Sequence, residues 1–324
     1  MIKSSIFYLV GLLFILNISA CQQTSQTKSK GLFGFWETNT IPTPTNRSCF
    51  STSPSHRRTK STVFLLAAGA DTGGLTETST DVNNFSQIVQ GHFNIPQTQI
   101  CELTNAFKAE LVNALHSLNQ HLINDDLVII YFSGHGSHIS DDNGDEQDGW
   151  DEALVTYDIK GKTSPRATDI LRDDHFAALV NALPTNRIMT VMDTCFSSGM
   201  YLRKNKPNAI LANARNKFFV KGEIGTQAPR FQSDQNSVLK KNEVGNFETL
   251  EGLLLAATSE EQKALEIPNQ GGLFTLIWVQ ELKKWGNIRQ AFEQAALQVQ
   301  EKSQNGPFPQ TPQAIGEWGV LREN

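Results

Sequence analysis

Four short apolar runs recur along the chain, and none of them alternates with polar residues. They are Val63–Ala68, Leu127–Phe132, Ile188–Met192 and Leu253–Ala257. Strands that are buried on both faces of a parallel sheet have this composition, because neither face meets water. The pattern therefore predicts four buried strands.

Between and after these runs, apolar residues recur at spacings of three and four, which predicts amphipathic helices. The expected helices are Asp81–Phe93, 107–122, Asp173–Leu183, Leu273–Trp285 and Ile288–Val299. Strands that alternate with helices predict an α/β fold with a mostly parallel central sheet flanked by helices. The pattern fades over about residues 203–247, where we expect a long polar loop.

The first 20 residues have the pattern of a signal peptide. Lys3 precedes an apolar run, Ile6–Leu16, that is shorter than the roughly 20 residues needed to cross a bilayer. Small residues then lead to Cys21, which resembles the lipobox of bacterial lipoproteins, whose cysteine carries the lipid. The alternative is an ordinary signal peptide with an incidental cysteine.

The resemblance implies an exported lipoprotein anchored to a membrane through Cys21. Gln22, in place of an aspartate after the cysteine, is similar to the sorting choice of outer-membrane lipoproteins and favours a periplasm-facing position. Residues 21–60 are rich in Ser, Thr, Gln and Pro without apolar periodicity. We interpret them as a tether and an irregular lead-in to the domain.

Composition narrows the class of protein and of partner. The 324 residues are 39% hydrophobic and 19% charged, with a formal net charge of -5 and no long basic run. This is the balance of a globular protein, and it offers no electrostatic footprint for nucleic acid. The pattern leaves the oligomeric state open.

The number of cysteines limits the disulfides that can form. Of the four cysteines, Cys21 would carry lipid, which leaves Cys49, Cys101 and Cys195, an odd number in a compartment that favours disulfides. One thiol must therefore stay unpaired. A bridge between Cys49 and Cys101 and a set of three independent thiols both remain open.

Candidate chemistry follows two of the expected strands. Ser133-Gly134-His135-Gly136 comes after one strand, and Asp193-Thr194-Cys195 comes after another. Reactive groups gather beyond the carboxyl ends of parallel strands. A cysteine thiolate is a nucleophile, and a nearby histidine can take its proton and later protonate a leaving amine.

The glycines that flank His135 allow a sharp turn and the close approach of a substrate. We expect the N–H groups of Gly136 and Cys195 to form an oxyanion hole. Taken alone, a buried cysteine is more often inert and a single histidine more often structural. The strand-end placement of both residues favours a catalytic Cys195/His135 dyad.

These two motifs, extended to Tyr131–Gly136 and Asp193–Ser197, resemble the catalytic motifs of caspase-like cysteine peptidases, most closely the metacaspase and orthocaspase branch. The similarity runs over Ser61–Leu202 and resumes in shorter segments to about residue 313. It implies a caspase-like domain over residues 61–321. Two positions depart from the family pattern, Phe196 and Ser198.

The resemblance implies a cysteine endopeptidase that acts on proteins or peptides through a thioacyl intermediate and requires no cofactor for its chemistry. The rival interpretation is a catalytically inactive module that uses the same fold to bind peptides or to act as a scaffold at the cell envelope. The intact dyad with both flanking glycines favours the enzyme.

Asp81, Asp193 and Ser133 match positions that form an acidic specificity pocket in metacaspases. A pair of carboxylates favours a guanidinium or an ammonium group, so we expect cleavage after Arg or Lys. The polar loop offers many such residues and is the expected site of self-cleavage. For Asp81, the alternative is a helix N-cap.

An acidic stretch, Asp141–Glu152, follows the histidine and carries seven acids without a Lys or Arg. Oxygen ligands of this kind suit Ca²⁺, but Glu146 stands where an EF-hand requires glycine. The resemblance to metacaspases implies instead a calcium site at Asp151, Asp173 and Asp174, with Ca²⁺ as an activator. The alternative for Asp173 and Asp174 is an acidic helix N-terminus.

Overall fold

The structure is a computed structural model. It describes residues 43–44, 47, 49–50, 60–140, 144, 150–162, 165–195, 211, 213–219, 247–259, 262–304, 306 and 308–322. The expected signal peptide and Cys21 lie outside the described residues. Within the described ranges, no helix combines the length and the apolar character needed to cross a membrane.

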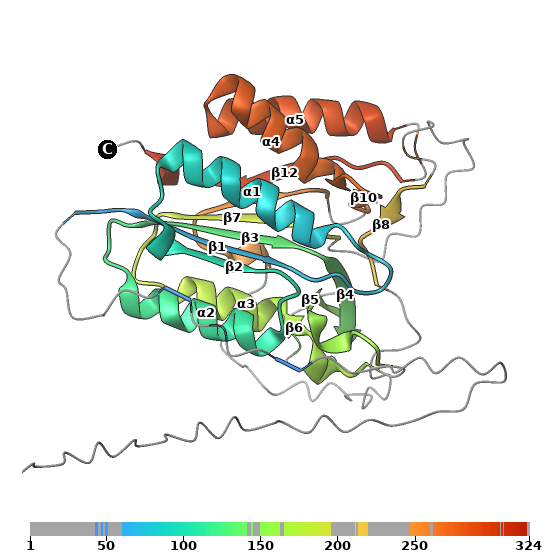
Figure 1. Ribbon diagram of the computed structural model, residues 1–324, viewed down its shortest axis with the longest axis horizontal. Coiled ribbons are helices and arrows are strands. Elements are labelled where there is room, and N and C mark those ends of the chain that lie inside the picture. The colour runs from blue at the N-terminus through green and yellow to red at the C-terminus, as the bar shows by residue number, and fades with distance from the viewer. Residues whose placement is uncertain are drawn as a thin grey trace, which may run out of the picture. The chain divides into compact units, whose positions relative to one another are not determined.

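A six-stranded sheet forms the centre of the described domain (Figure 1). Its strands, in their order across the sheet, are β12 (Gln313–Gly316), β9 (Leu253–Ala256), β7 (Ile188–Asp193), β3 (Leu127–Ser133), β1 (Val63–Gly69) and β2 (Ile100–Leu103). All neighbours run parallel except β12, which is antiparallel to β9.

Helices cover both faces of this sheet (Figure 1). One face carries α1 (Thr78–Phe93), α4 (Leu273–Trp285) and α5 (Ile288–Ser303), and the other carries α2 (Lys108–His121) and α3 (Asp173–Asn181). Short 3₁₀ helices lie in the connections, at Gln97–Gln99, Tyr157–Ile159, Ala167–Asp169, Phe247–Thr249 and Trp318–Leu321.

The pleat of the strands explains why both faces need a cover. Along β1, Leu65 packs into the cluster that contains Phe85 and Trp278, whereas the next residue, Leu66, packs into the cluster that contains Phe176. Successive side chains of a strand point to opposite faces, so a continuous apolar run supplies two cores at once. This produces the three layers.

Two small sheets lie beyond the main one. The first joins β4 (His135–Ser140), β5 (Trp150–Val155) and β6 (Leu171–Arg172), and the second joins β8 (Arg215–Asn216), β10 (Leu265–Ile267) and β11 (Gly271–Gly272). The first continues directly from β3, because only Gly134 separates β3 from β4. The second contains part of the segment that the sequence predicts as a polar loop.

The four predicted strands and five predicted helices are confirmed, with ends that shift by a few residues at most. The α/β fold with a mostly parallel sheet is confirmed as well. The edge strands β2 and β12 and both small sheets are missing from the prediction. Most of these strands have two to four residues, a length at which the pattern does not separate a strand from a loop. β4 and β5 have six residues each, but polar residues interrupt their apolar pattern.

Candidate active site

The two predicted motifs meet at one edge of the main sheet. β3 and β7 are parallel neighbours, and their last residues, Ser133 and Asp193, lie side by side. The N–H of Gly134 donates to the carbonyl of Asp193 at 3.3 Å, which joins the chains just beyond the strands. His135 and Cys195 each follow two residues later, so the parallel register brings both to the same edge.

His135 is the first residue of β4 and is only 3% exposed. Gly73, at φ 56°, packs against its ring, and a Cβ at that glycine would lie 2.7 Å from Nε2. Burial lowers the pKa of His135 from 6.5 to about 4, although nearby backbone carbonyls of Lys217 and Gly73 raise it. The imidazole is therefore neutral near pH 7, and burial makes it a weaker base than a solvated histidine.

Cys195 is also buried, with 1% of its surface exposed. Its Sγ accepts a hydrogen bond from the N–H of Ala264 at 3.1 Å. Burial raises the pKa of the thiol to about 12, against the stabilising effects of the Ala264 N–H and the charge of Lys217. In this arrangement the thiol keeps its proton, so a reaction needs a base beside it.

Gly136 lies directly against the backbone of Cys195. A Cβ at Gly136 would collide with the Cys195 carbonyl oxygen, so this position accepts no side chain. The Gly136 N–H donates to the carbonyl of Lys217 at 2.8 Å. The Gly136 N–H, one of the two expected oxyanion donors, is thus already hydrogen-bonded to a peptide carbonyl.

Lys217 fills the predicted acidic pocket. Its side chain is 0% exposed, and its Nζ lies 3.0 Å from Asp193 Oδ1 and 3.3 Å from Asp81 Oδ2. The same Nζ donates to Ser133 Oγ at 2.9 Å and to the carbonyl of Asp193 at 3.2 Å. The structure thus brings the three predicted pocket residues together around one buried cation.

Backbone and hydroxyl groups from the second half of the domain hold the two carboxylates in place. Gly272 N–H donates to both oxygens of Asp81, at 2.8 and 3.0 Å. Thr275 donates to Asp193 Oδ2 through its hydroxyl at 2.6 Å and its N–H at 3.2 Å. Asp81 lies in the first turn of α1, whose N-cap is Glu77, so the N-cap alternative for Asp81 is wrong.

The charges in this pocket depend on one another. Burial raises the pKa of Asp81 from 3.8 to about 6, with Lys217 opposing the shift and Asp193 adding to it. Burial alone would lower the pKa of Lys217, but Asp193 and Asp81 raise it well above its usual range. The lysine is therefore charged, and each carboxylate needs a cation beside it.

Lys217 belongs to a docked segment, residues 214–219, in which the short strand β8 is followed by a bend at Lys217. Within it, β8 pairs antiparallel with β10, and Lys217 N–H donates to the Ala264 carbonyl at 2.9 Å. Beyond the lysine, Phe219 N–H donates to the Gly136 carbonyl at 2.9 Å. Main-chain bonds therefore fix the segment on both sides of Lys217, as a bound peptide strand is fixed.

The sequence contains faint signals for this arrangement. Lys217 precedes the apolar run Phe218–Val220 in a mostly polar stretch. Thr275 lies in one of the shorter segments where the resemblance resumes, but its spacing gives it no role. Lys217 contacts Asp193, Ser133 and Asp81, which are 24, 84 and 136 positions away, and Thr275 contacts Asp193 across 82 positions. Local periodicity does not report contacts at these separations.

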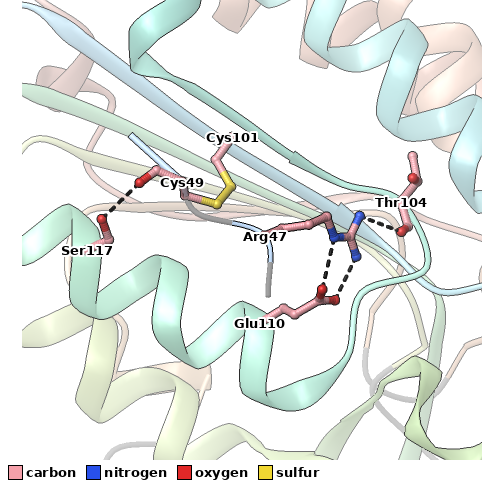
Figure 2. Close-up of a disulfide and its surroundings, with 6 residues drawn as sticks. All are labelled: Arg47, Cys49, Cys101, Thr104, Glu110 and Ser117. Carbon is pink, nitrogen blue, oxygen red and sulfur yellow. Dashed lines mark hydrogen bonds and ion pairs between the residues drawn. A yellow bond between two sulfur atoms is a disulfide. The ribbon is translucent and has the colours of Figure 1, made fainter. Parts of the chain in front are cut away.

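A disulfide joins Cys49 to Cys101 on β2, with their Cα atoms 5.2 Å apart (Figure 2). This settles the alternatives left open by the sequence, and Cys195 remains a free thiol. Beside the bridge, Arg47 makes two bonds to Glu110, at 2.9 and 2.6 Å, and one to the Thr104 carbonyl at 2.9 Å. The lead-in is thus fastened to β2 and α2.

The expected calcium residues lie in and beside the first small sheet. Asp151 on β5 is buried and forms an ion pair with Arg172, while Asp173 and Asp174 begin α3. In the ranges that the structure describes, which leave out 141–143 and 145–149, no group of three His, Cys, Asp or Glu side chains is placed to hold a metal ion. Since Arg172 already neutralises Asp151, these residues by themselves do not form an oxygen cage, and calcium binding stays a prediction.

Two curated relatives match part of this chain. It is 30% identical over 126 residues to Metacaspase-1A of Aspergillus oryzae and 31% identical over 127 residues to Metacaspase-2 of Arabidopsis thaliana. Each match covers 36% of this chain and 29% of the relative. The chain therefore matches less than a third of the length of these relatives.

The fold and the family are shown by wider matches. The crystal structure of protein GSU0716 from Geobacter sulfurreducens superposes with a TM-score of 0.56 at 17% identity, covering 81% of this chain and 97% of that one. Residues 66–316 match the family model described as the caspase domain. This range contains β3, β7, the docked segment and every residue of the site described above. The chain belongs to the caspase domain family.

Proposed function

We propose that this protein is a cysteine endopeptidase that cleaves after Lys or Arg and that cuts itself between Lys217 and Phe218. The observation that supports this is the double placement of Lys217. Its side chain lies between Asp81 and Asp193, while its carbonyl oxygen accepts a hydrogen bond from Gly136. A substrate with a basic residue before the cleaved bond needs both contacts at once.

The proposed reaction uses His135, Cys195 and Gly136, which the fold brings to one edge of the main sheet. His135 takes the proton of the Cys195 thiol, and the sulfur attacks the carbonyl carbon of Lys217 to form a C–S bond. The resulting oxyanion is stabilised by Gly136 N–H. The C–N bond then breaks as His135 gives its proton to the nitrogen of Phe218, which leaves a thioester. Water, deprotonated by His135, hydrolyses the thioester, so that Lys217 ends in a carboxylate and the thiol is restored.

The preference for basic residues follows from the pocket charges. Two carboxylates without a cation would both be buried and uncompensated, which costs several kcal/mol on the scale of buried ion pairs. An incoming Lys or Arg restores the balance after Lys217 has left. An incoming Asp adds a third negative charge and is repelled.

Self-cleavage is tested by incubating the purified full chain and sequencing the N-termini of its fragments. We expect a fragment that begins at Phe218, and no such fragment from Cys195→Ala. Lys302→Ala, which removes an exposed lysine in the last turn of α5, is the matched control and should still be cut at Phe218. Fragments that begin after acidic residues would contradict the proposal, and an inactive module would leave the chain intact.

Specificity is tested with fluorogenic peptides that carry Lys, Arg, Leu or Asp before the reporter group. We expect Lys and Arg peptides to be cleaved at least about 100-fold faster than the others, because the charge meets Asp193 in a desolvated pocket. Asp193→Asn should reduce this ratio, whereas the surface variant Asp125→Asn should retain it. An unchanged ratio in Asp193→Asn would overturn the pocket assignment.

We further propose that the domain acts outside the cytoplasm, attached by a lipid on Cys21. The Cys49–Cys101 disulfide supports this, because such bridges persist in oxidising compartments. Cys21→Ser should move the protein from the membrane fraction to the soluble fraction in cell fractionation. Retention of Cys21→Ser in the membrane fraction would show that the lipid is not the anchor.

A further inference from the structure

The docked segment makes a second charged contact two residues before Lys217. Arg215 Nη1 lies 3.2 Å from Glu266 Oε1 and donates to Thr76 Oγ1 at 2.9 Å. Arg215 and Glu266 face each other across the antiparallel pair of β8 and β10. Glu266 also acts electrostatically on Lys217 and raises its pKa, so the charges of Arg215 and Lys217 both lie near this carboxylate, on one wall of the site.

Glu266 is held in place without the help of Arg215. Its side chain is 0% exposed, and its two carboxylate oxygens accept the N–H groups of Thr76 and Glu77, each at 3.1 Å. These two residues directly precede α1. The carboxylate is therefore fixed by the body of the domain, and the cation opposite it belongs to the segment that the proposed cleavage would release.

The two halves of this contact differ in burial. The Arg215 side chain is 39% exposed, whereas Glu266 is fully covered. An ion pair whose cation is partly exposed is screened by solvent and adds little to folding stability, since exposed pairs contribute about 1 kcal/mol or less. The same geometry serves recognition well, because a rigid carboxylate keeps its position while different cations enter from solvent.

The wall of the site carries more negative than positive charge, which favours a basic peptide. Three buried carboxylates, Asp81, Asp193 and Glu266, face two cations, Lys217 and Arg215. Once the docked segment leaves, these three carboxylates lose the two cations that it supplies. A peptide that replaces the segment would bring a favourable charge at both positions only if it is basic at both.

We propose that Glu266, assisted by Thr76, is a specificity-determining residue for the substrate position two residues before the cleaved basic residue, and that it selects Arg there. Preferred substrates then have the form Arg-X-Lys or Arg-X-Arg, with cleavage after the last residue. This inference rests on the proposed function, since it assumes that a substrate binds in the same way as the docked segment.

The test uses the full chain, after an incubation that allows self-cleavage, with acetylated tripeptides that release a fluorophore after Lys. The first residue is Arg, its uncharged isostere citrulline, or Glu, followed by Asn and Lys. We expect kcat/KM to be about tenfold higher for Arg than for citrulline, which is the effect of one charge-assisted hydrogen bond. The Glu peptide should be slowest.

Two variants test whether Glu266 and Thr76 cause the preference for Arg over citrulline. Glu266→Gln should bring the Arg and citrulline rates together while Lys remains preferred over Leu before the reporter. Thr76→Ala should lower the rates of both the Arg and the citrulline peptide by about two- to fivefold, because both side chains can donate to that hydroxyl. The wild-type panel decides the question even if Glu266→Gln does not fold.

The outcomes separate the two proposals. Equal cleavage of the Arg and citrulline peptides by the wild type, with Lys still required before the reporter, would overturn this inference and leave the proposed function standing. The inference would also fall if Glu266→Gln kept the full preference for Arg. Absence of cleavage of every peptide that ends in Lys or Arg would overturn the proposed function itself.

Discussion

Two irregular segments insert a cation among carboxylates of this domain, and they do so in opposite ways. The strap, defined by Arg47, Cys49 and Phe50, carries an arginine that is 31% exposed and a disulfide to β2. The docked segment carries Lys217, which is 0% exposed and has no covalent link to its partners. Arg47 thus lies partly in solvent beside a covalent link, whereas Lys217 is fully buried without one.

The difference in burial separates a structural contact from a functional one. The ion pair of the strap is partly in water and adds little by itself, so the disulfide does most of the fastening. The pair around Lys217 is desolvated, and a buried ion pair is often no more stable than apolar side chains of the same volume. The pocket needs a cation, and no covalent bond holds Lys217 in it. The pocket is therefore suited to exchange Lys217 for the basic side chain of a substrate.

The largest effect should come from the dyad. Cys195→Ala and His135→Ala should each reduce cleavage at Lys217 by more than about 1000-fold, because the nucleophile or its base is removed. Gel analysis of the intact chain over time measures this. The double variant Cys49→Ser/Cys101→Ser keeps the dyad and should still cut itself. Self-cleavage in Cys195→Ala would refute the mechanism.

The second prediction compares the two cations by stability, in the Cys195→Ala background so that the chain stays intact. Lys217→Met leaves Asp81 and Asp193 without a cation and should lower the free energy of unfolding by about 3–5 kcal/mol. Arg47→Met removes a partly exposed pair and should lower it by about 1 kcal/mol or less. Denaturant titration measures both, and equal losses would remove the distinction between the segments.

The third prediction concerns the strap alone. Cys49→Ser/Cys101→Ser opens a link between residues 52 positions apart and should lower the free energy of unfolding by about 2–4 kcal/mol. The preference for Lys over Leu in peptide cleavage should stay the same, since no strap residue contacts Lys217 in the described structure. A changed preference would show that the strap reaches the site.

The sequence predicts the frame of the site because its signals are local. Continuous apolar runs mark β1, β3, β7 and β9, and the parallel arrangement then brings His135 and Cys195 to one edge. The position of Asp193 at the end of an apolar strand already indicates a charge in need of a partner. These inferences use only neighbouring residues and one rule of topology.

The partner of that charge was not predictable in the same way. Lys217 is one of many basic residues in a polar stretch, and only the apolar run Phe218–Val220 after it sets it apart from a solvated lysine. Its burial depends on Gly272, where a Cβ would overlap Asp193 Oδ2 and approach Lys217 Nζ, and on the pairing of β8 with β10. The disulfide and Glu266 are long-range features of the same kind.

The smallest effect should be a difference in pH dependence between the enclosed and the released site. With the docked segment in place, burial holds the pKa of His135 at about 4, so the imidazole remains a neutral base well below pH 6. After release, solvent reaches the ring and its pKa should move back toward 6.5, so that protonation removes the base at higher pH. The loss of Lys217 also removes the charge that opposes the raised pKa of Asp81, which weakens binding of a basic side chain as the pH falls.

Peptide cleavage should therefore fall about tenfold between about pH 6.5 and 5.5, whereas self-cleavage should change little over the same interval. Fluorescence assays with a Lys peptide and gel assays of the intact chain, run in the same buffers, measure the two profiles. The Asp125→Asn variant serves as a control, because its change is on the surface and should shift neither profile. If the rates of peptide cleavage and of self-cleavage fell over the same acidic pH range, the docked segment would not shield His135. The contrast between an enclosed and an exchangeable site would then lose its support.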